Sequence, residues 1–477
     1  MSSQTAAGVL LLLVVVAVVL RLLIPGPPAV AAPQTAEPAQ AVGSLNPEFM
    51  GMAIRDPYYD YNSFPGMPGP NVYAQEAMGQ QLEQMGVRWV RLEFIADPDG
   101  IHFDKYDYFI SQVAPRHNLK VLAVLATQII PDNPVSLNTG TVSTDPVYGG
   151  GINTYMRRWL DAALQIAARY NGGAYGRIQA FEIFNEANRF FGDGTNLPDG
   201  LQYAGLNPDY VARLHAKFYR ICKNTDNSQP AARCPADTTI IVGGLHPKGT
   251  SAKRKPDEKE TFTFTDEEYL QRMYQTAFSD FKNYAGNGPA WQGRWPVDGV
   301  GFHPYPEEIT PRESATRSIA DDLSIKIMPR LNQMRAMLIA VQDAAQPFWI
   351  TEVGYNVGSY KVRGPAAEAN QAEFMLQLYT LLAARGDVAN VFWFKYEDFP
   401  PADIVSDKKG KAIADPQRWG VVHIPFTEGG TVNDIPCAGG ACYEPTGQPE
   451  YVRMSYLVYR ELAGLPVYKT YVPFMGK

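Results

Sequence analysis

The sequence has no excess of basic residues and no basic stripe. Its 477 residues include 42 Lys and Arg against 49 Asp and Glu, so the net charge at pH 7 is −7. A protein that binds nucleic acid needs clustered cations to neutralise phosphates. The basic run Lys253–Lys255 is followed at once by acidic residues and indicates a solvated loop of mixed sign. We therefore expect no nucleic-acid partner.

Motifs that define several other protein classes are also missing. No G-x-G-x-x-G follows the first expected strand, which disfavours a dinucleotide-binding fold. No G-x-S-x-G elbow is present, which argues against a serine esterase. The sequence contains no C-x-x-C and no His cluster at metal-ligand spacing, so we expect no metal site.

Cysteine is scarce, with four residues in the chain. Cys222 and Cys234 flank a polar connection rich in Asn and Pro, and Cys437 and Cys442 flank Ala-Gly-Gly-Ala. Two local disulfides are the simplest of the possible pairings, with metal binding as the alternative. Structural disulfides are typical of proteins that act outside the cytoplasm.

The longest hydrophobic run lies at the N-terminus. Val9–Leu20 is unbroken, and Ala29–Ala31 (AVA) supplies a cleavage pattern, so residues 1–31 are predicted to be a signal peptide. An uncleaved signal anchor is the alternative, because no Lys or Arg precedes the run and Arg21 follows it. Val9–Ile24 is, however, short for a span of roughly 20 apolar residues. In either case we expect the rest of the chain to be extracellular, either secreted or tethered to the outer face of the cell membrane.

Residues 32–47 are predicted to form a linker rich in Pro and Ala, and residues 48–477 a single large domain. In this domain short apolar runs alternate with longer amphipathic stretches, the pattern of repeated βα units. Eight such units favour a closed (β/α)8 barrel over an open doubly wound sheet. The expected strands are Phe49–Ile54, Arg88–Phe94, Lys120–Ala126, Ile178–Phe184, Thr239–Gly243, Gly299–His303, Phe348–Thr351 and Asn390–Phe394. The expected helices are Tyr73–Met85, Thr154–Tyr170, Tyr210–Cys222, Asp266–Tyr284, Asp322–Ala344, Glu368–Arg385 and Tyr451–Leu462.

The connections that follow the expected strands are longer than those that precede them. Thr127–Ile152, Ala187–Asp209 and Leu245–Thr265 are examples, and Glu397–Glu450 is the longest. Barrel active sites are assembled from these loops, so we expect the functional residues at their starts. The last loop contains Trp419–Ile424, which indicates a small β addition near the C-terminus.

Two glutamates directly follow apolar strands. Glu186 follows the fourth expected strand and Glu352 the seventh, so the two can face each other across the mouth of a closed barrel. Cleavage of a glycosidic bond needs such a pair, because one carboxyl group protonates the leaving oxygen while the other attacks the anomeric carbon. Alternatively, the two glutamates could have a purely structural role, as N-caps of helices or as partners in salt bridges at the rim of the barrel.

Asn185-Glu186 after one strand, with Thr351-Glu352 at a later one, resembles glycoside hydrolase clan A. This clan contains retaining (β/α)8 enzymes such as cellulases, mannanases and xylosidases. The resemblance extends from residue 48 to about residue 394. It implies hydrolysis of a β-linked glycan or glycoside by double displacement, with an oligo- or polysaccharide as substrate and no cofactor. A transglycosylase and a non-catalytic carbohydrate-binding barrel are the alternatives.

The resemblance also implies roles for individual residues. Glu186 is expected to be the general acid/base, and Glu352 is expected to be the nucleophile. The negative charge of Glu352 nearby is expected to raise the pKa of Glu186. Asn185 is expected to bind the sugar 2-hydroxyl, Arg91 to hydrogen-bond the nucleophile, and Trp393 to form a platform under the sugar. The full set of substrate-binding residues implied in this way is Asn185, Arg91, His303, Tyr305 and Trp393.

Some of these residues have a structural interpretation as well. Arg91 could pair with Glu93 or Glu182, His303 could be a core histidine, and Trp393 could simply pack in an aromatic run. Glu182 lies four residues before Glu186 on the same strand face, deeper in the barrel, and is expected to form a buried ion pair.

Two positions depart from the pattern of the clan. Many members have Pro after the acid/base, where this chain has Ala187. Many cellulase-like members have His at the end of the third strand, where this chain has Ala126-Thr127-Gln128. The second departure argues against a cellulase-type subsite. The family within the clan, the sugar and its linkage, and exo or endo action all stay open.

Overall fold

The computed structural model describes most of the chain after residue 43. The described residues are 44–55, 69–189, 205–226, 234–247, 264–306, 319, 322–357, 365–399, 418–428, 431–432, 435–436 and 441–467. The predicted signal or anchor (1–31) and most of the predicted linker lie outside these ranges and stay predictions. None of the helices within the ranges is long and apolar enough to cross a membrane.

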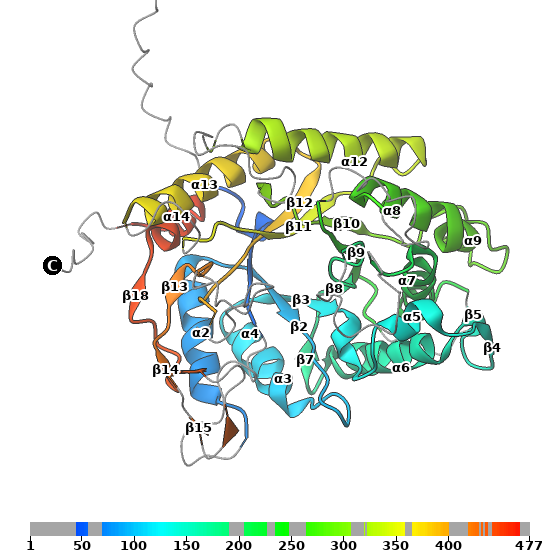
Figure 1. Cartoon of the computed structure of the whole chain (residues 1–477), viewed down its shortest axis with the longest axis horizontal. Helices are drawn as coiled ribbons and strands as arrows, with labels where there is room; N and C mark the ends of the chain where they lie inside the picture. The colour runs from blue at the N-terminus through cyan, green and yellow to red at the C-terminus, as the bar shows by residue number, and fades with distance from the viewer. Residues whose placement is uncertain are drawn as a thin grey trace, which may run out of the picture. The chain divides into compact units, whose positions relative to one another are not determined.

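Eight parallel strands close into a barrel in the order β1-β12-β11-β10-β9-β8-β3-β2 (Figure 1). Each of the eight expected strands is present, which confirms the (β/α)8 architecture. The long apolar runs favoured this outcome because barrel strands are buried on both faces. The strands are β1 (Met50–Ala53), β2 (Trp89–Glu93), β3 (Lys120–Leu125), β8 (Ala180–Ile183), β9 (Thr239–Leu245), β10 (Gly299–Phe302), β11 (Phe348–Val353) and β12 (Val388–Trp393).

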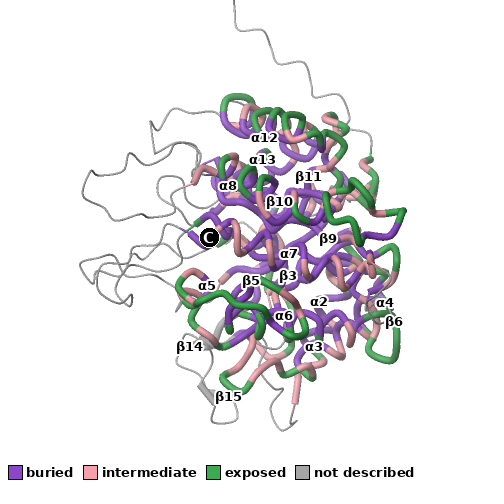
Figure 2. The backbone as a smooth tube through the Cα atoms, turned by 90° about the vertical axis from the view of Figure 1, so that its right-hand side faces the viewer, coloured by how far each residue is buried: buried purple, intermediate pink, exposed green. Residues whose placement is uncertain are grey.

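Helices surround the barrel, and their exposed residues lie on the outer side while the strands are buried (Figure 2). The larger ones are α2 (Val72–Met85), α6 (Thr154–Arg169), α7 (Pro208–Lys223), α8 (Asp266–Met273), α12 (Met328–Ala340), α13 (Pro365–Ala383) and α14 (Met454–Leu462). The expected helix Asp266–Tyr284 is interrupted after α8 by a wide turn, in which Thr276 has a non-helical backbone, and resumes as α9 (Ser279–Lys282). The short helices α3 (Asp104–Tyr108) and α4 (Ala114–Arg116) were not predicted.

The barrel interior begins with an apolar layer. Gly51 and Gly299 leave room for the aromatic rings of this layer. A Cβ atom on Gly51 would lie 2.5 Å from the Phe392 ring, and a Cβ atom on Gly299 would lie 2.7 Å from the Trp349 ring. The layer consists of Trp89, Leu122, Ala180, Ile241, Trp349 and Phe392. Polar residues lie two positions further along three of these strands, above this floor, and they form the site described below.

The predicted β addition near the C-terminus is present as small antiparallel sheets. The expected strand Trp419–Ile424 is shorter, because only β13 (Val422–His423) pairs, with β18 (Tyr451–Val452). The expected helix Tyr451–Leu462 therefore begins later, at Met454. The other pairs are β14 (Phe426–Glu428) with β17 (Ala441–Tyr443) and β15 (Thr431–Val432) with β16 (Ile435–Pro436).

One of the two predicted disulfides is confirmed. Cys222 in α7 is bonded to Cys234 before β9, so the bond closes a short loop between a helix and the next strand. Cys437 lies outside the described residues, and its pairing with Cys442 stays a prediction.

Candidate active site

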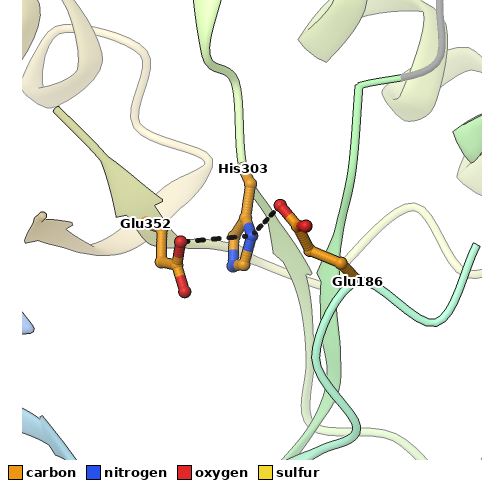
Figure 3. Close-up of side chains that lie close together, drawn as sticks. All are labelled: Glu186, His303 and Glu352. Carbon is orange, nitrogen blue, oxygen red and sulfur yellow. Dashed lines mark hydrogen bonds and ion pairs between the residues drawn. The ribbon is translucent and has the colours of Figure 1, made fainter. Parts of the chain in front are cut away.

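The carboxyl groups of Glu186 and Glu352 approach each other at the carboxyl ends of β8 and β11 (Figure 3). One oxygen of each carboxyl group and a ring nitrogen of His303 all lie within 4.8 Å of one another. Glu186 is 7% exposed and Glu352 8% exposed. The fold therefore brings together the two glutamates that the strand pattern singled out.

A sharp turn after β8 positions Glu186. Phe184 and Glu186 have left-handed backbone angles, with φ of 68° and 44°. The Phe184 ring stacks on Trp159 of α6, with ring centroids 5.0 Å apart, and the Glu186 amide donates to the carbonyl of Gly244 at 2.9 Å. These contacts offset the cost of a backbone conformation that side chains with a Cβ rarely adopt.

An irregularity in β11 positions Glu352. Trp349 packs in the apolar layer inside the barrel, and the Thr351 hydroxyl donates to Glu182 at 3.0 Å. The register with β12 then shifts between Ile350 and Val353. Because such a shift breaks the simple alternation of side chains, Glu352 also lies at the barrel mouth beside Thr351.

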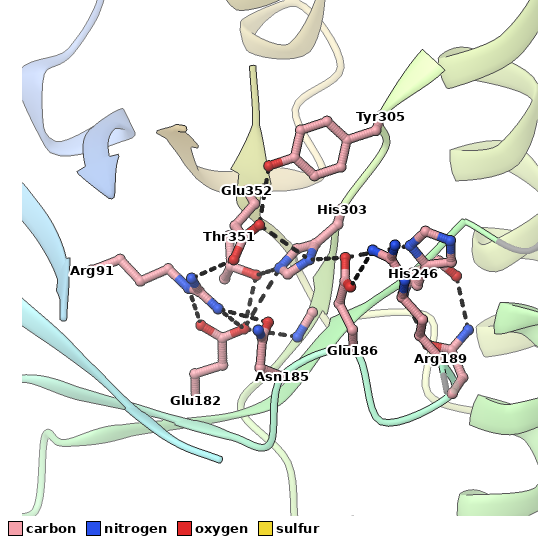
Figure 4. A network of polar contacts seen from close by, with 12 residues as sticks. Arg91, Glu182, Asn185, Glu186, Arg189, His246, His303, Tyr305, Thr351 and Glu352 are labelled. Carbon is pink, nitrogen blue, oxygen red and sulfur yellow. Dashed lines mark hydrogen bonds and ion pairs between the residues drawn. The ribbon is translucent and has the colours of Figure 1, made fainter. Parts of the chain in front are cut away.

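Arg91 of β2 connects three residues of the site (Figure 4). Its guanidinium, 2% exposed, donates to Glu182 Oε2 and Glu352 Oε1, both at 2.6 Å, and to Asn185 Oδ1 at 2.9 Å. Burial lowers the pKa of Arg91, but the charges of Glu182 and Glu352 outweigh it and raise that pKa above its usual value. The predicted contact with Glu352 and the predicted ion pair of Glu182 are both confirmed.

Tyr305 supplies a second donor to Glu352. Its hydroxyl donates to Glu352 Oε2 at 3.0 Å. Burial and the charge of Glu352 raise the pKa of Tyr305 well above its usual value, so the hydroxyl keeps its proton at neutral pH. Each Glu352 oxygen thus accepts a hydrogen bond, one from a cation and one from a neutral hydroxyl.

His303 lies between the two glutamates and is fully buried. Its Nδ1 is 3.1 Å from Glu186 Oε1 and 3.7 Å from Glu352 Oε2, and its Nε2 is 2.9 Å from the Thr351 hydroxyl. Gly244 makes this packing possible, since a Cβ there would lie 1.9 Å from Nε2. Burial lowers the pKa of His303, but the neighbouring carboxylates raise it more, so its net shift is upward.

This shift predicts a pH dependence of stability. Because the folded-state pKa of His303 is raised, its protonation stabilises the fold fully below about pH 6.5, the unfolded value, and this contribution is lost as the pH rises through the folded pKa. The free energy of unfolding of the wild type should therefore exceed that of His303→Gln most at low pH, and the gap should narrow as the pH rises. Urea unfolding of both proteins at a series of pH values measures this difference in the free energy of unfolding. A difference that does not change with pH would contradict the prediction.

Glu186 has a different environment from the one predicted. His246 Nδ1 is 3.4 Å from Glu186 Oε1, and Arg189 donates to Oε2 at 3.1 Å. Burial raises the pKa of Glu186, but the hydrogen bonds and charges of His246 and His303 outweigh it and hold that pKa well below its usual value. The prediction that the charge of Glu352 raises this pKa is wrong, because the nearer imidazoles dominate.

His246 and Arg189 were missed by the sequence analysis. His246 directly follows the apolar strand β9, which is the same signal that singled out Glu186. Asn188 holds it in place, since the Asn188 amide donates to the His246 carbonyl at 2.8 Å and accepts from the His246 amide at 2.9 Å. Arg189 has no comparable signal, because it lies in a loop and its contact arises from the turn after β8.

Trp393 does not form the predicted platform. It is fully buried and packs against Phe374 of α13, with ring centroids 6.1 Å apart, on the outer side of the sheet. The next residue, Phe394, lies near Tyr305 and Trp419 instead, at centroid distances of 6.3 and 5.8 Å. Because side chains alternate along a strand, these two neighbouring aromatic side chains point to opposite sides, and Trp393 packs against the helix layer.

Glu186, His303 and Glu352 form a group of metal-binding size within the described ranges. However, Arg91 and Tyr305 already occupy the Glu352 oxygens. The guanidinium of Arg91, 2.6 Å from Glu352, would also repel a cation. We therefore assign no metal to this group.

Comparison with known proteins gives similar structures but no family. No protein-family model matches the chain, and no curated protein sequence matches it. A family 39 glycoside hydrolase from Bacteroides cellulosilyticus WH2 is 14% identical over 88% of this chain, with a TM-score of 0.46, and the chain spans 64% of its length. Xylanase 10B from Thermotoga maritima is 11% identical over 87% of this chain and 94% of its own, with a TM-score of 0.45.

An endo-β-1,4-mannanase from Thermotoga petrophila is 12% identical over 87% of this chain and 76% of its own, with a TM-score of 0.44. The assignment of the barrel does not depend on these similarities, because the closed sheet of the chain establishes it. Fold and site together define a (β/α)8 barrel protein with two carboxyl groups facing each other at the carboxyl ends of its strands.

Proposed function

We propose that this protein hydrolyses O-glycosidic bonds in a β-linked glycan or glycoside, with retention of the anomeric configuration. The proposal rests on one observation: one carboxyl oxygen of Glu186 and one of Glu352 lie within 4.8 Å of each other. Carboxyl groups about 5–5.5 Å apart suit a covalent double displacement, whereas inverting enzymes leave about 6.5–9.5 Å for a water molecule.

In the first step Glu352 attacks the anomeric carbon while Glu186 protonates the leaving oxygen, so the glycosidic bond breaks and a glycosyl ester with Glu352 forms. Arg91 and Tyr305 orient the attacking carboxylate by their hydrogen bonds. In the second step Glu186 takes a proton from water, and the resulting hydroxide oxygen attacks the same carbon and releases Glu352.

Glu186 must acquire a proton before the first step, because its low pKa keeps it ionised in the free enzyme. The imidazoles of His246 and His303 are its nearest possible proton donors, at 3.4 and 3.1 Å. A proton passed from either ring to Glu186 goes on to the leaving oxygen, and the proton taken from water in the second step restores the ring. Substrate binding would favour the transfer by excluding water from the carboxylate.

The stereochemistry of the first product tests the proposal. Aryl β-glycosides and β-glycans are screened for hydrolysis, and proton NMR follows the anomer released from an active substrate. The β anomer is expected to appear first. Initial release of the α anomer would contradict the assignment of Glu352 as nucleophile, and transfer of the sugar to an added glycoside in preference to water would identify a transglycosylase instead.

Replacing Glu186 by Ala separates its role from that of Glu352. General acid–base catalysis contributes about 10²- to 10⁴-fold, so hydrolysis of substrates with poor leaving groups should fall by that factor in Glu186→Ala. A dinitrophenyl glycoside needs no protonation of its leaving group, so its glycosylation rate should change little. Added azide should then yield a β-glycosyl azide, because the glycosyl-enzyme no longer has a base for water. An equal loss of hydrolysis rate on substrates with good and with poor leaving groups would contradict the acid/base role of Glu186.

We further propose that the enzyme acts outside the cytoplasm. The apolar run Val9–Leu20 and the disulfide Cys222–Cys234 support this location. Fractionation of cells that express the full chain, with N-terminal sequencing of the mature protein, tests it. Cleavage near residue 31 indicates secretion, an intact N-terminus in the membrane fraction indicates a tether, and an intact chain in the cytoplasm would contradict both.

A further inference from the structure

A cavity on the outer wall of the barrel has an unusual concentration of positive charge. It lies between α7, α9 and the hairpin formed by β4 (Ser143–Asp145) and β5 (Gly149–Ile152), and its volume is about 260 Å³. Arg213, Lys217 and Arg220 line it from one face of α7, because residues spaced by three and four lie on the same side of a helix. Among the lining residues that the structure describes, Asp280 is the one acidic residue.

In the part of the chain that the structure describes, these cations lack the acidic partners that other cations on the outer helices have. Lys223 on the same helix pairs with Asp298 at 3.1 Å, and Arg272 on α8 pairs with Asp209 at 2.8 Å. Within the described ranges Arg213, Lys217 and Arg220 make no ion pair, although the protein is acidic overall. Burial, together with the charges of Arg213 and Arg220, lowers the pKa of Lys217 to about 8, although the charge of Asp145 in β4 acts in the opposite direction.

Backbone contacts hold the cations in place without neutralising them. Arg213 donates to the carbonyl of Gly151 at 2.5 Å, and Lys217 donates to that of Tyr148 at 2.6 Å. Gly151 has a φ of 74°, and a Cβ there would lie 2.6 Å from the Arg213 guanidinium, so the hairpin is shaped to this arginine. Arg220 lies over the Tyr284 ring at 4.1 Å. Each cation has further N–H donors, since an arginine has five and a lysine three.

We propose that this cavity binds the oxyanion group, a carboxylate, sulfate or phosphate, of a ligand no larger than an acidic monosaccharide. Three cations converge on a space of that size, and two of them are pre-positioned by the hairpin, so little conformational entropy is lost on binding. A bound anion offsets the mutual repulsion of the cations and accepts charge-assisted hydrogen bonds from them. The site is separate from the carboxylate pair and does not depend on the proposed function.

The full chain is titrated calorimetrically with inorganic phosphate, glucose 6-phosphate, glucuronate and glucose. We expect saturable binding of the anionic probes at one site and none of glucose. Equal affinity for phosphate and glucose 6-phosphate indicates recognition of the oxyanion alone, whereas a preference for the sugar anions indicates that the ligand is an acidic sugar. No saturable binding of any anion would overturn the proposal.

Variants locate the binding. Lys217→Gln and Arg220→Gln should each weaken it by about tenfold or more, the scale of a hydrogen bond to a charged group. Arg220→Gln leaves the hairpin contacts intact, so it tests the site even if Lys217→Gln folds poorly. Arg272→Gln on α8 removes the same charge outside the cavity and should bind as the wild type does. Equal affinity in all three variants would indicate an adventitious ion only.

Proton uptake gives a second readout. A bound anion raises the pKa of Lys217 from about 8, so binding at pH 8 should take up as much as about half a proton. Calorimetry in two buffers of different ionisation enthalpy measures this uptake, which should be absent in Lys217→Gln. Affinity should also fall as the pH rises above 8, because Lys217 then loses its charge before the anion binds. Binding without proton uptake would contradict a role for Lys217.

Discussion

Glu352→Gln should reduce hydrolysis of every substrate by at least about 10⁴-fold, the scale on which removing a covalent nucleophile acts. The amide is nearly the same size as the carboxylate, its oxygen can still accept from Arg91, and its NH2 group can donate to the Tyr305 hydroxyl oxygen, so the fold should persist. Unlike the loss in Glu186→Ala, this loss should not depend on the leaving group, because no glycosyl-enzyme forms.

The measurement is the rate of aryl glycoside cleavage together with mass spectrometry of enzyme trapped with a 2-fluoro glycoside. The wild type should gain the mass of one sugar on Glu352, and Glu352→Gln should gain none. Glu93→Gln is a matched control, because Glu93 lies 3.8 Å from the same arginine but is partly exposed and has no role in the mechanism. A label on another residue, or activity retained in Glu352→Gln, would contradict the assignment.

Arg91→Leu should destabilise the fold by about 3–5 kcal/mol, the cost of removing one partner of a buried ion pair. Leucine would leave Glu182, which is fully buried, without its cation, and would leave Glu352 without one of its donors. The free energy of unfolding in urea measures the effect. Activity should fall as well, because Tyr305 alone then orients the Glu352 carboxylate.

Two variants control this prediction. Adding Glu182→Gln to Arg91→Leu removes the uncompensated charge, so the double variant should be more stable than Arg91→Leu alone. Arg158→Leu breaks the exposed pair of Arg158 with Asp132, and its effect should be too small to measure. If Arg91→Leu were as stable as Arg158→Leu, the buried network would not contribute to stability in the way inferred.

The barrel was predictable because each strand is an apolar run between turn residues. The strand boundaries moved by only a few residues, for example from Arg88–Phe94 to Trp89–Glu93. The short helices between β2 and β3 were missed because Asp104–Tyr108 is too short to develop a helical repeat of apolar residues. The break inside the expected helix Asp266–Tyr284 was missed because it is confined to the backbone at Thr276.

The packing of Trp393 was not predictable from residue type. Trp393 and Phe394 both belong to an aromatic run, and only the register of β12 decides which ring lies in the core and which lies near Tyr305. A shift of one residue moves a side chain to the other face of a strand. The resemblance therefore identified an aromatic segment beside the site, but the role that it implied for Trp393 is wrong.

The sequence by itself determined that eight strands alternate with helices and that carboxyl groups follow the fourth and seventh of them. Both features are local, since each depends on a short apolar run and the residue after it. Only the tertiary structure decided that Glu186 and Glu352 come within 4.8 Å and that His246 and His303 lower the pKa of Glu186. Coulomb interactions and hydrogen bonds depend on distance in space, and those distances exist only once the barrel has closed.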